Sequence, residues 1–119
     1  MMRYLCLLYV EERKYTPGAP GYEEVVAANV AANKAMADAG VLVDSAPLQP
    51  VRSATTLRIR DDETLLTDGP YAELKEQLGG YYLLECADLD EALRWARTIP
   101  AARYGSVEVR PLMAVGGRG

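Results

Sequence analysis

Apolar and polar positions along the chain follow two different spacings, and their order predicts a mixed α+β fold. Residues 2–10 form a continuous apolar run, which is typical of a strand covered on both faces. Between residues 22 and 39 the apolar positions recur at helical spacing, and Gly40 stands where such a helix ends. We expect the buried stripe of this helix to contain Tyr22, Val25, Val26, Ala32 and Met36.

The middle of the chain predicts an edge strand followed by a β-hairpin. Residues 41–50 begin as an apolar run and then carry two prolines, with Asp44 at the break, so an irregular edge strand is expected. From residue 55 to residue 60 apolar and polar side chains alternate, which indicates a half-buried strand. Asp61-Asp62 then supplies the hairpin turn, although without the glycine that a type I′ turn favours.

The segment "TDGPYAELKEQLGGYYLLE" predicts a tight turn, a short helix and a strand in close succession. Proline at the first helical position lacks only an N–H that would be unpaired there, and Gly79 is expected to end this helix. Gly80 would then let the chain turn directly into the strand. Asp68 has two open interpretations: it braces the turn by accepting backbone hydrogen bonds, or its carboxylate faces a pocket.

A last helix and a last strand complete the domain. Asp88 and Glu91 form an Asp version of the capping box at the start of the helix, and Pro100 ends it. Two long helices between strands favour a ferredoxin-like antiparallel sheet with helices on one face. We expect one domain over residues 1–112, a loose tail over residues 113–119, and a homodimer formed through the uncovered apolar sheet face.

Composition narrows the classes of function. The net charge of −4 argues against nucleic acid as a partner. No apolar run reaches the roughly 18 residues of a membrane span, and two glutamates follow the first strand in place of a cleavage site, so a cytoplasmic location is expected. Cys6 and Cys86 lie in apolar runs without a CxxC spacing, which favours buried, reduced thiols.

The chain contains no histidine. This excludes Ser-His and Cys-His arrangements and removes the commonest metal ligand, and no acidic spacing resembles a calcium loop. We therefore expect no metal and no cofactor. Asn29 and Asn33 lie one turn apart on the apolar stripe of the first helix, where an unpaired amide costs on the order of 1–3 kcal/mol. They either hydrogen-bond within the core or line a pocket between helix and sheet.

Several segments of the sequence also resemble a known protein family. "LTDGPYAELKEQLGGYYLLE", "ADLDEALRWARTIPAARYGSVEVRPL", "AGVLVDSAPLQP" and "MRYLCLLY" are similar to strings of the YCII-related proteins, and the first marks their DGPF subgroup. The likeness covers nearly the whole chain. It implies a dimeric α+β barrel, in which two ferredoxin-like protomers pack sheet to sheet.

The same resemblance implies little about a reaction. YCII-like proteins are described as having a site built from a histidine and an aspartate, and DGPF members often occur beside extracytoplasmic-function sigma factors, which suggests a regulatory partner. Many relatives carry the histidine on the first helix at the position of Asn29 in this chain. An amide does not exchange protons near neutral pH, so acid–base chemistry of that kind is in doubt here. Tyr71 replaces the phenylalanine of the motif.

Three hypotheses about function follow. The preferred one is a cytoplasmic homodimer that binds a small organic ligand between the first helix and the sheet, near the DGP turn. The second is a cofactor-free enzyme of monooxygenase or isomerase type, with Asp68 as a base whose pKa is raised by burial. The third is an interaction module for a sigma factor or similar regulator. The candidate ligand contacts are Asn29, Asn33, Tyr22, Tyr71, Asp44 and Asp68.

Overall fold

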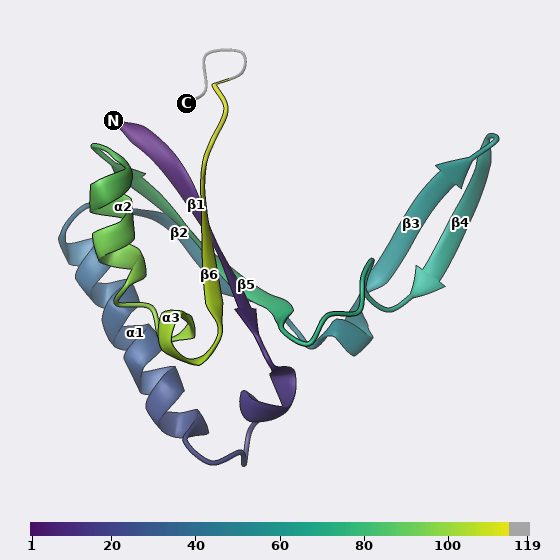
Figure 1. Cartoon of the computed structure of the whole chain (residues 1–119), viewed down its shortest axis with the longest axis horizontal. Coiled ribbons are helices and arrows are strands. Elements are labelled where there is room, and N and C mark those ends of the chain that lie inside the picture. The colour runs from purple at the N-terminus through teal and green to yellow at the C-terminus, as the bar shows by residue number, and fades with distance from the viewer. Residues whose placement is uncertain (115–119) are drawn as a thin grey trace.

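A computed structural model describes residues 1–114 of the chain (Figure 1). Residues 115–119, most of the predicted tail, lie outside this description. The strands are β1 (Met2–Val10), β2 (Leu42–Pro47), β3 (Thr55–Arg60), β4 (Glu63–Asp68), β5 (Gln77–Cys86) and β6 (Ser106–Pro111). The helical elements are η1 (Glu12–Lys14), α1 (Tyr22–Asp38), η2 (Val51–Ser53), α2 (Leu89–Ala96) and α3 (Ala101–Tyr104).

Four of the strands form one antiparallel sheet in the order β2-β5-β1-β6. The helix α1 connects β1 to β2, and α2 with α3 connects β5 to β6. This arrangement confirms the predicted ferredoxin-like α+β fold. None of the helices in residues 1–114 combines the length and the apolar character that crossing a membrane would require.

The core lies between the helices and one face of this sheet. Alternate residues of β1 and β5 are buried there, and Met36 and Ile99 fill the space beneath the helices. Both cysteines, Cys6 and Cys86, are free and fully buried, which confirms the predicted core thiols. The predicted stripe of the first helix is right at Ala32 and Met36, but its other three members are half-buried or exposed.

The capping box of α2 is confirmed. The carboxylate of Asp88 accepts a hydrogen bond from the Glu91 N–H at 2.9 Å. Glu91 in turn accepts one from the Ala87 N–H at 2.7 Å. These two bonds satisfy donors that the first turn of a helix leaves open, so the start of α2 is set locally by its sequence.

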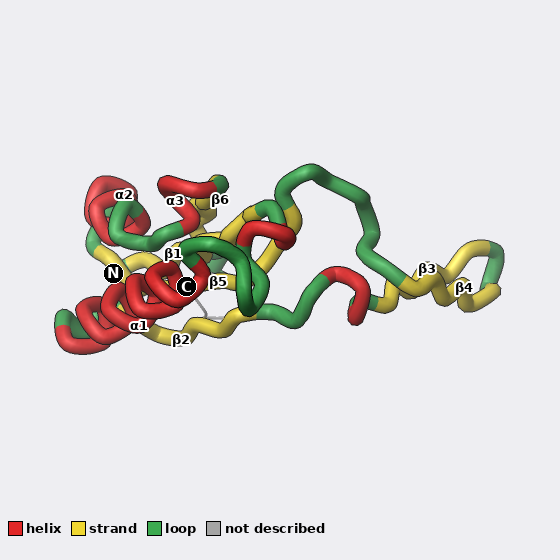
Figure 2. Tube along the Cα trace, turned by 90° about the horizontal axis from the view of Figure 1, so that it is seen from below, coloured by secondary structure: helices red, strands yellow, loops and turns green. Residues whose placement is uncertain are grey.

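Within residues 1–114 the strands β3 and β4 pair only with each other, and they form a hairpin outside the main sheet. Figure 2 shows this hairpin standing away from the body at the end of two connecting segments. Asp61 and Asp62 both adopt positive φ angles, 49° and 63°, so the turn has the left-handed pair of residues that a type I′ hairpin needs.

The short helix predicted over residues 70–78 is wrong. Residues 70–76 are irregular, and β5 begins at Gln77, with Leu78 opposite Tyr9 of β1. A helix of two turns is marginal by itself, and the nine-residue strand β1 offers backbone partners along its full length. Pairing with β1 therefore extends β5 through both glycines, and Gly79 ends no helix.

Candidate functional site

The two asparagines of α1 face the sheet, as predicted, and both are hydrogen-bonded to it. Asn29 accepts a hydrogen bond from the Tyr82 hydroxyl at 3.0 Å and donates to the Val25 carbonyl at 3.2 Å. The amide of Asn33 donates to the hydroxyl of Ser45. These bonds agree with the structural interpretation, because each amide joins α1 to a strand of the sheet.

Asp44 lies on the opposite face of the sheet. Ser45 is paired with Tyr82 on the helix side, so the alternation of the strand turns Asp44 and Tyr81 toward the uncovered side. There the Tyr81 hydroxyl donates a hydrogen bond to the Asp44 carboxylate at 2.8 Å. This bond raises the pKa of Tyr81 above its ordinary value, with burial adding to the effect.

Asp68 does not meet the two amides within one chain. It is exposed at the end of β4, paired with Thr55 at the base of the hairpin. The predicted cavity that joins Asn29, Asn33 and Asp68 is therefore not formed within the chain, and Asp68 is not buried, as the hypothesis of a catalytic base requires. Tyr22 is half-buried in the first turn of α1.

A cleft of about 670 Å³ lies instead where the hairpin joins the body. One wall is the connecting segment of residues 48–54, the other is residues 70–78, which run from the second connecting segment into the start of β5, and the end of β1 contributes Tyr9. Among the predicted site residues, Tyr71 lines this cleft. Its lining is Tyr9, Leu48, Gln49, Pro50, Val51, Ser53, Ala54, Pro70, Tyr71, Ala72, Leu74, Gln77 and Leu78.

The DGP turn brings the two walls together. The Gly69 N–H donates to the Ala54 carbonyl at 2.8 Å, and the Thr56 hydroxyl donates to the Gly69 carbonyl at 2.9 Å. Gly69 has a φ of +105°, a conformation that residues with a side chain rarely adopt. The motif thus closes the base of the hairpin and delivers Pro70 and Tyr71 to the cleft.

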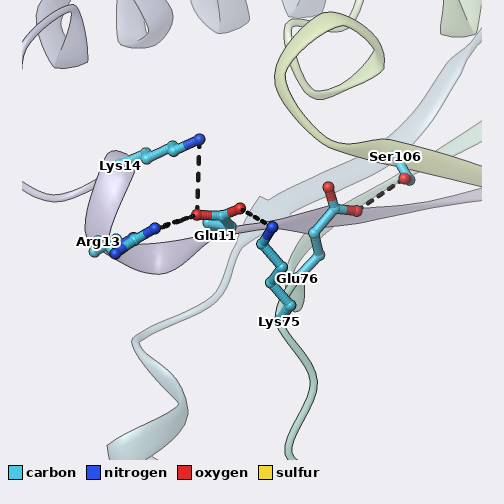
Figure 3. Close-up of polar contacts among 6 residues, drawn as sticks. All are labelled: Glu11, Arg13, Lys14, Lys75, Glu76 and Ser106. Carbon is cyan, nitrogen blue, oxygen red and sulfur yellow. Dashed lines mark hydrogen bonds and ion pairs between the residues drawn. The ribbon is translucent and has the colours of Figure 1, made fainter.

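Each wall is also attached to the body by one of two neighbouring glutamates after β1. Glu12 accepts a hydrogen bond from the Val51 N–H at 2.8 Å, which holds the first wall. Glu11 forms an ion pair with Lys75 at 3.5 Å, which holds the second wall (Figure 3). In the same view Glu76 accepts a hydrogen bond from the Ser106 hydroxyl at 2.8 Å.

Glu11 is surrounded by positive charge. Its carboxylate contacts Arg13 at 3.3 Å and Lys14 at 3.7 Å in addition to Lys75. Burial tends to raise the pKa of Glu11, but the charges of the two lysines and of Arg13 together outweigh burial and hold that pKa below its ordinary value. The carboxylate of Glu11 is therefore ionised at neutral pH, and its ion pair with Lys75 is present.

The lining of the cleft limits its chemistry. It contains no charged side chain, and its polar groups include the hydroxyls of Tyr9, Tyr71 and Ser53 and the amide of Gln49. Within the described residues, no side-chain hydrogen bond engages these four groups. Residues 1–114 contain no cluster of three acidic or cysteine side chains arranged to hold a metal ion. The cleft is suited to apolar contact with a few hydrogen bonds.

Sequence reasoning missed most of this cleft. The sequence places Tyr9 only in a covered strand, and it predicts only an irregular edge for the proline-marked segment from Leu48 to Pro50. The sequence does show two adjacent glutamates, Glu11 and Glu12, directly after the first strand, but it places Arg13 and Lys14 beside them and so gives no sign of more distant partners. Their partners come from residues 51 and 75, far along the chain, so the local sequence does not name them.

Two comparisons find known proteins that are similar to this chain over nearly its whole length. Residues 2–115 match the YCII-related domain family. An uncharacterized protein from Rhizobium meliloti (strain 1021) is 43% identical over 114 residues, covering 93% of this chain and 92% of the relative. Since the match spans nearly the whole described domain, the chain belongs to the family of proteins with a YCII-related domain.

Proposed function

We propose that the protein binds a small organic molecule in the cleft at the base of the hairpin. The observation that carries this proposal is the uncharged, largely apolar lining together with hydroxyl and amide groups that are not engaged by the chain. The volume falls within the range of about 300–1,000 Å³ that is usual for small-molecule sites. A neutral, partly aromatic ligand fits this lining best, because burying a charge without a partner is costly.

Tyr71 is the residue that most directly supports the choice of ligand class. Its ring is highly exposed, and the guanidinium of Arg58 lies 5.2 Å from the centre of the ring. An aromatic ligand lying against Tyr71 would cover this apolar surface while the hydroxyl stays available for a hydrogen bond. The DGP motif then has a positional role: it places Tyr71, and Asp68 remains outside the contact.

Protein-observed ¹H–¹⁵N NMR titration with a library of neutral aromatic fragments tests the site. We expect Tyr71→Ala to lower the affinity of the tightest-binding fragment by at least about tenfold, which corresponds to about 1.4 kcal/mol of binding free energy. Tyr22→Ala is the matched control, since it removes a tyrosine that does not line the cleft. Ligand-induced shifts centred on Asn29 and Asn33, or equal affinity in the Tyr71→Ala protein, would move the site away from the cleft.

We also propose that the uncovered face of the sheet pairs with a second copy of the chain. Leu5, Leu7 and Leu83 lie together on this face with Tyr81, and no element of the described chain packs over them. Charged pairs flank them, with Arg3 bonded to Glu85 at 3.2 Å. An apolar centre with a polar border is the usual anatomy of a protein interface.

A further inference from the structure

The β3–β4 hairpin has one apolar face. In its antiparallel register Leu57 lies directly opposite Leu66, and Ile59 is next to them on the same side. Leu57 and Ile59 are each 59% exposed and Leu66 is 65% exposed. The other side of the hairpin is mixed, with Arg58 opposite Leu65. Three adjacent aliphatic side chains are therefore presented to solvent by an element that projects from the body.

Such a hairpin lacks support from its own chain. In the described part, β3 and β4 contact each other extensively but no other strand or helix to a comparable degree. A two-stranded hairpin alone is marginally stable in water, and a hydrophobic face normally needs a third layer to cover it. The connecting segments hold only the base, through Ala54 and Gly69. The apolar face is accordingly expected to pack against another surface.

The dimensions of the chain show how much surface a single copy leaves uncovered. The radius of gyration is 16.1 Å, whereas a compact domain of 119 residues has about 13.5 Å. The accessible surface is 8347 Å², compared with about 6,300 Å² for a compact monomer of this mass. The difference of roughly 2,000 Å² exceeds the approximately 800 Å² that each partner contributes to a stable interface.

We infer that the hairpin is an arm that packs its apolar face, Leu57, Ile59 and Leu66, onto a second copy of the chain. The inference rests on the proposed pairing of two copies and adds the element that clasps the partner. A second copy is the occupant because the same chain carries both an unsupported apolar arm and an uncovered apolar sheet face. In a two-fold symmetric dimer each copy offers the same surfaces to the other, so the apolar face of each arm is covered by the partner chain. A dimer therefore accounts for both uncovered apolar surfaces.

Removal of the arm is the first test. The hydrogen bond between Gly69 and Ala54 shows that the ends of the hairpin meet, so residues 55–68 can be replaced by a Gly-Gly link without stretching the body. Sedimentation equilibrium of the full chain and of the shortened chain gives both dimer dissociation constants. We expect the shortened chain to dimerise at least about tenfold more weakly while circular dichroism shows a folded body.

The outcomes separate the two proposals. A full-length chain that stays monomeric at about 100 μM, far above the Kd of a specific dimer, would overturn both the pairing and the arm. A shortened chain that dimerises as tightly as the full chain would overturn the arm alone and leave the pairing in place.

A second variant keeps the backbone of the hairpin. Leu57→Thr with Leu66→Thr removes apolar surface from one cross-strand pair and retains residues that favour strands. Leu65→Thr on the other face is the matched control. The double variant should weaken the dimer by at least about tenfold, and the control should leave it unchanged. Hydrogen exchange of residues 55–68 should slow as the protein concentration rises through the dimer dissociation constant, and concentration-independent exchange would overturn the arm.

Discussion

The hydroxyl of Tyr15 is buried and has no hydrogen-bond partner within the described residues. Its ring packs edge-on against Tyr104, with 6.2 Å between the ring centroids. Burial, followed by the neighbouring Tyr104 and Glu76, raises the pKa of Tyr15 to about 12, so the phenol stays protonated at physiological pH. The ring thus contributes packing, while the hydroxyl loses hydrogen bonds with water on folding.

Tyr15→Phe should therefore stabilise the protein. It removes an unsatisfied polar group and keeps the ring, so we expect the free energy of unfolding to rise by about 1 kcal/mol. Urea denaturation at pH 7 measures the change, and Tyr104→Phe, at an exposed ring in the same pair, is the control. A decrease in stability would show that the Tyr15 hydroxyl binds a group or a water molecule.

Asn29 and Asn33 show how far reasoning from single residues extends. Their inward direction followed from helical spacing, and the rule that a buried amide must be paired was correct for both. The choice between core and pocket depended on residues 45 and 82, which only the sheet register brings to α1. Whether either amide contacts a ligand stays a prediction.

At the scale of elements, the two glycines of β5 differ in what they allow. A Cβ atom at Gly80 would lie 2.9 Å from the Ala46 carbonyl oxygen, which is backbone of the neighbouring strand. At Gly79 the nearest atom would be a side-chain methyl of Val10 at 3.2 Å. Close approach of β2 and β5 therefore depends on Gly80 in particular.

Gly80→Ala should cost more stability than Gly79→Ala. We expect a loss of about 1–3 kcal/mol at position 80, since a strand must shift to admit the methyl group, and a smaller loss at position 79. Both values come from chemical denaturation of otherwise identical proteins. The reverse order would favour the helix that ends at Gly79 over the extended β5.

At the scale of the whole molecule, the ion pairs of Glu11 make the attachment of one wall of the cleft depend on pH. The pKa of Glu11 is lower in the folded chain than its ordinary value because three cations outweigh the effect of burial. Its contribution to stability is complete above the ordinary glutamate pKa of about 4.3 and is lost as the pH falls through the lower folded value. The anchor to Lys75 weakens over the same range.

Glu11→Gln should remove this part of the acid sensitivity. We expect the free energy of unfolding of the wild type to fall more steeply than that of the variant between about pH 5 and pH 3. Glu73→Gln provides a control, because this exposed glutamate forms no ion pair within the described residues. Equal slopes for wild type and Glu11→Gln would show that the cluster does not stabilise the fold.

The architecture was largely predictable because its signals are local. Caps, turn residues and the two spacings identify β1, α1, the hairpin and α2, and their order is enough for a ferredoxin-like sheet. The prediction that the structure contradicts is the helix at residues 70–78. Its helical spacing was real, yet Leu74 lines the cleft and Leu78 pairs along β1, because backbone pairing outweighs the weak propensity of two turns.

The sequence by itself determined the fold class, the existence of β1, α1, the hairpin and α2, the buried thiols and the capping box of α2, because the signals for each lie within a few residues of one another. Only the tertiary structure decided that the hairpin stands away from the body, that the two asparagines fasten α1 to the sheet, and that a cleft opens between the connecting segments. These features depend on contacts between residues far apart in the chain, such as Glu12 with Val51. No local spacing in the sequence encodes such a pairing, because the loops that lie between the two residues do not specify which residue becomes the partner.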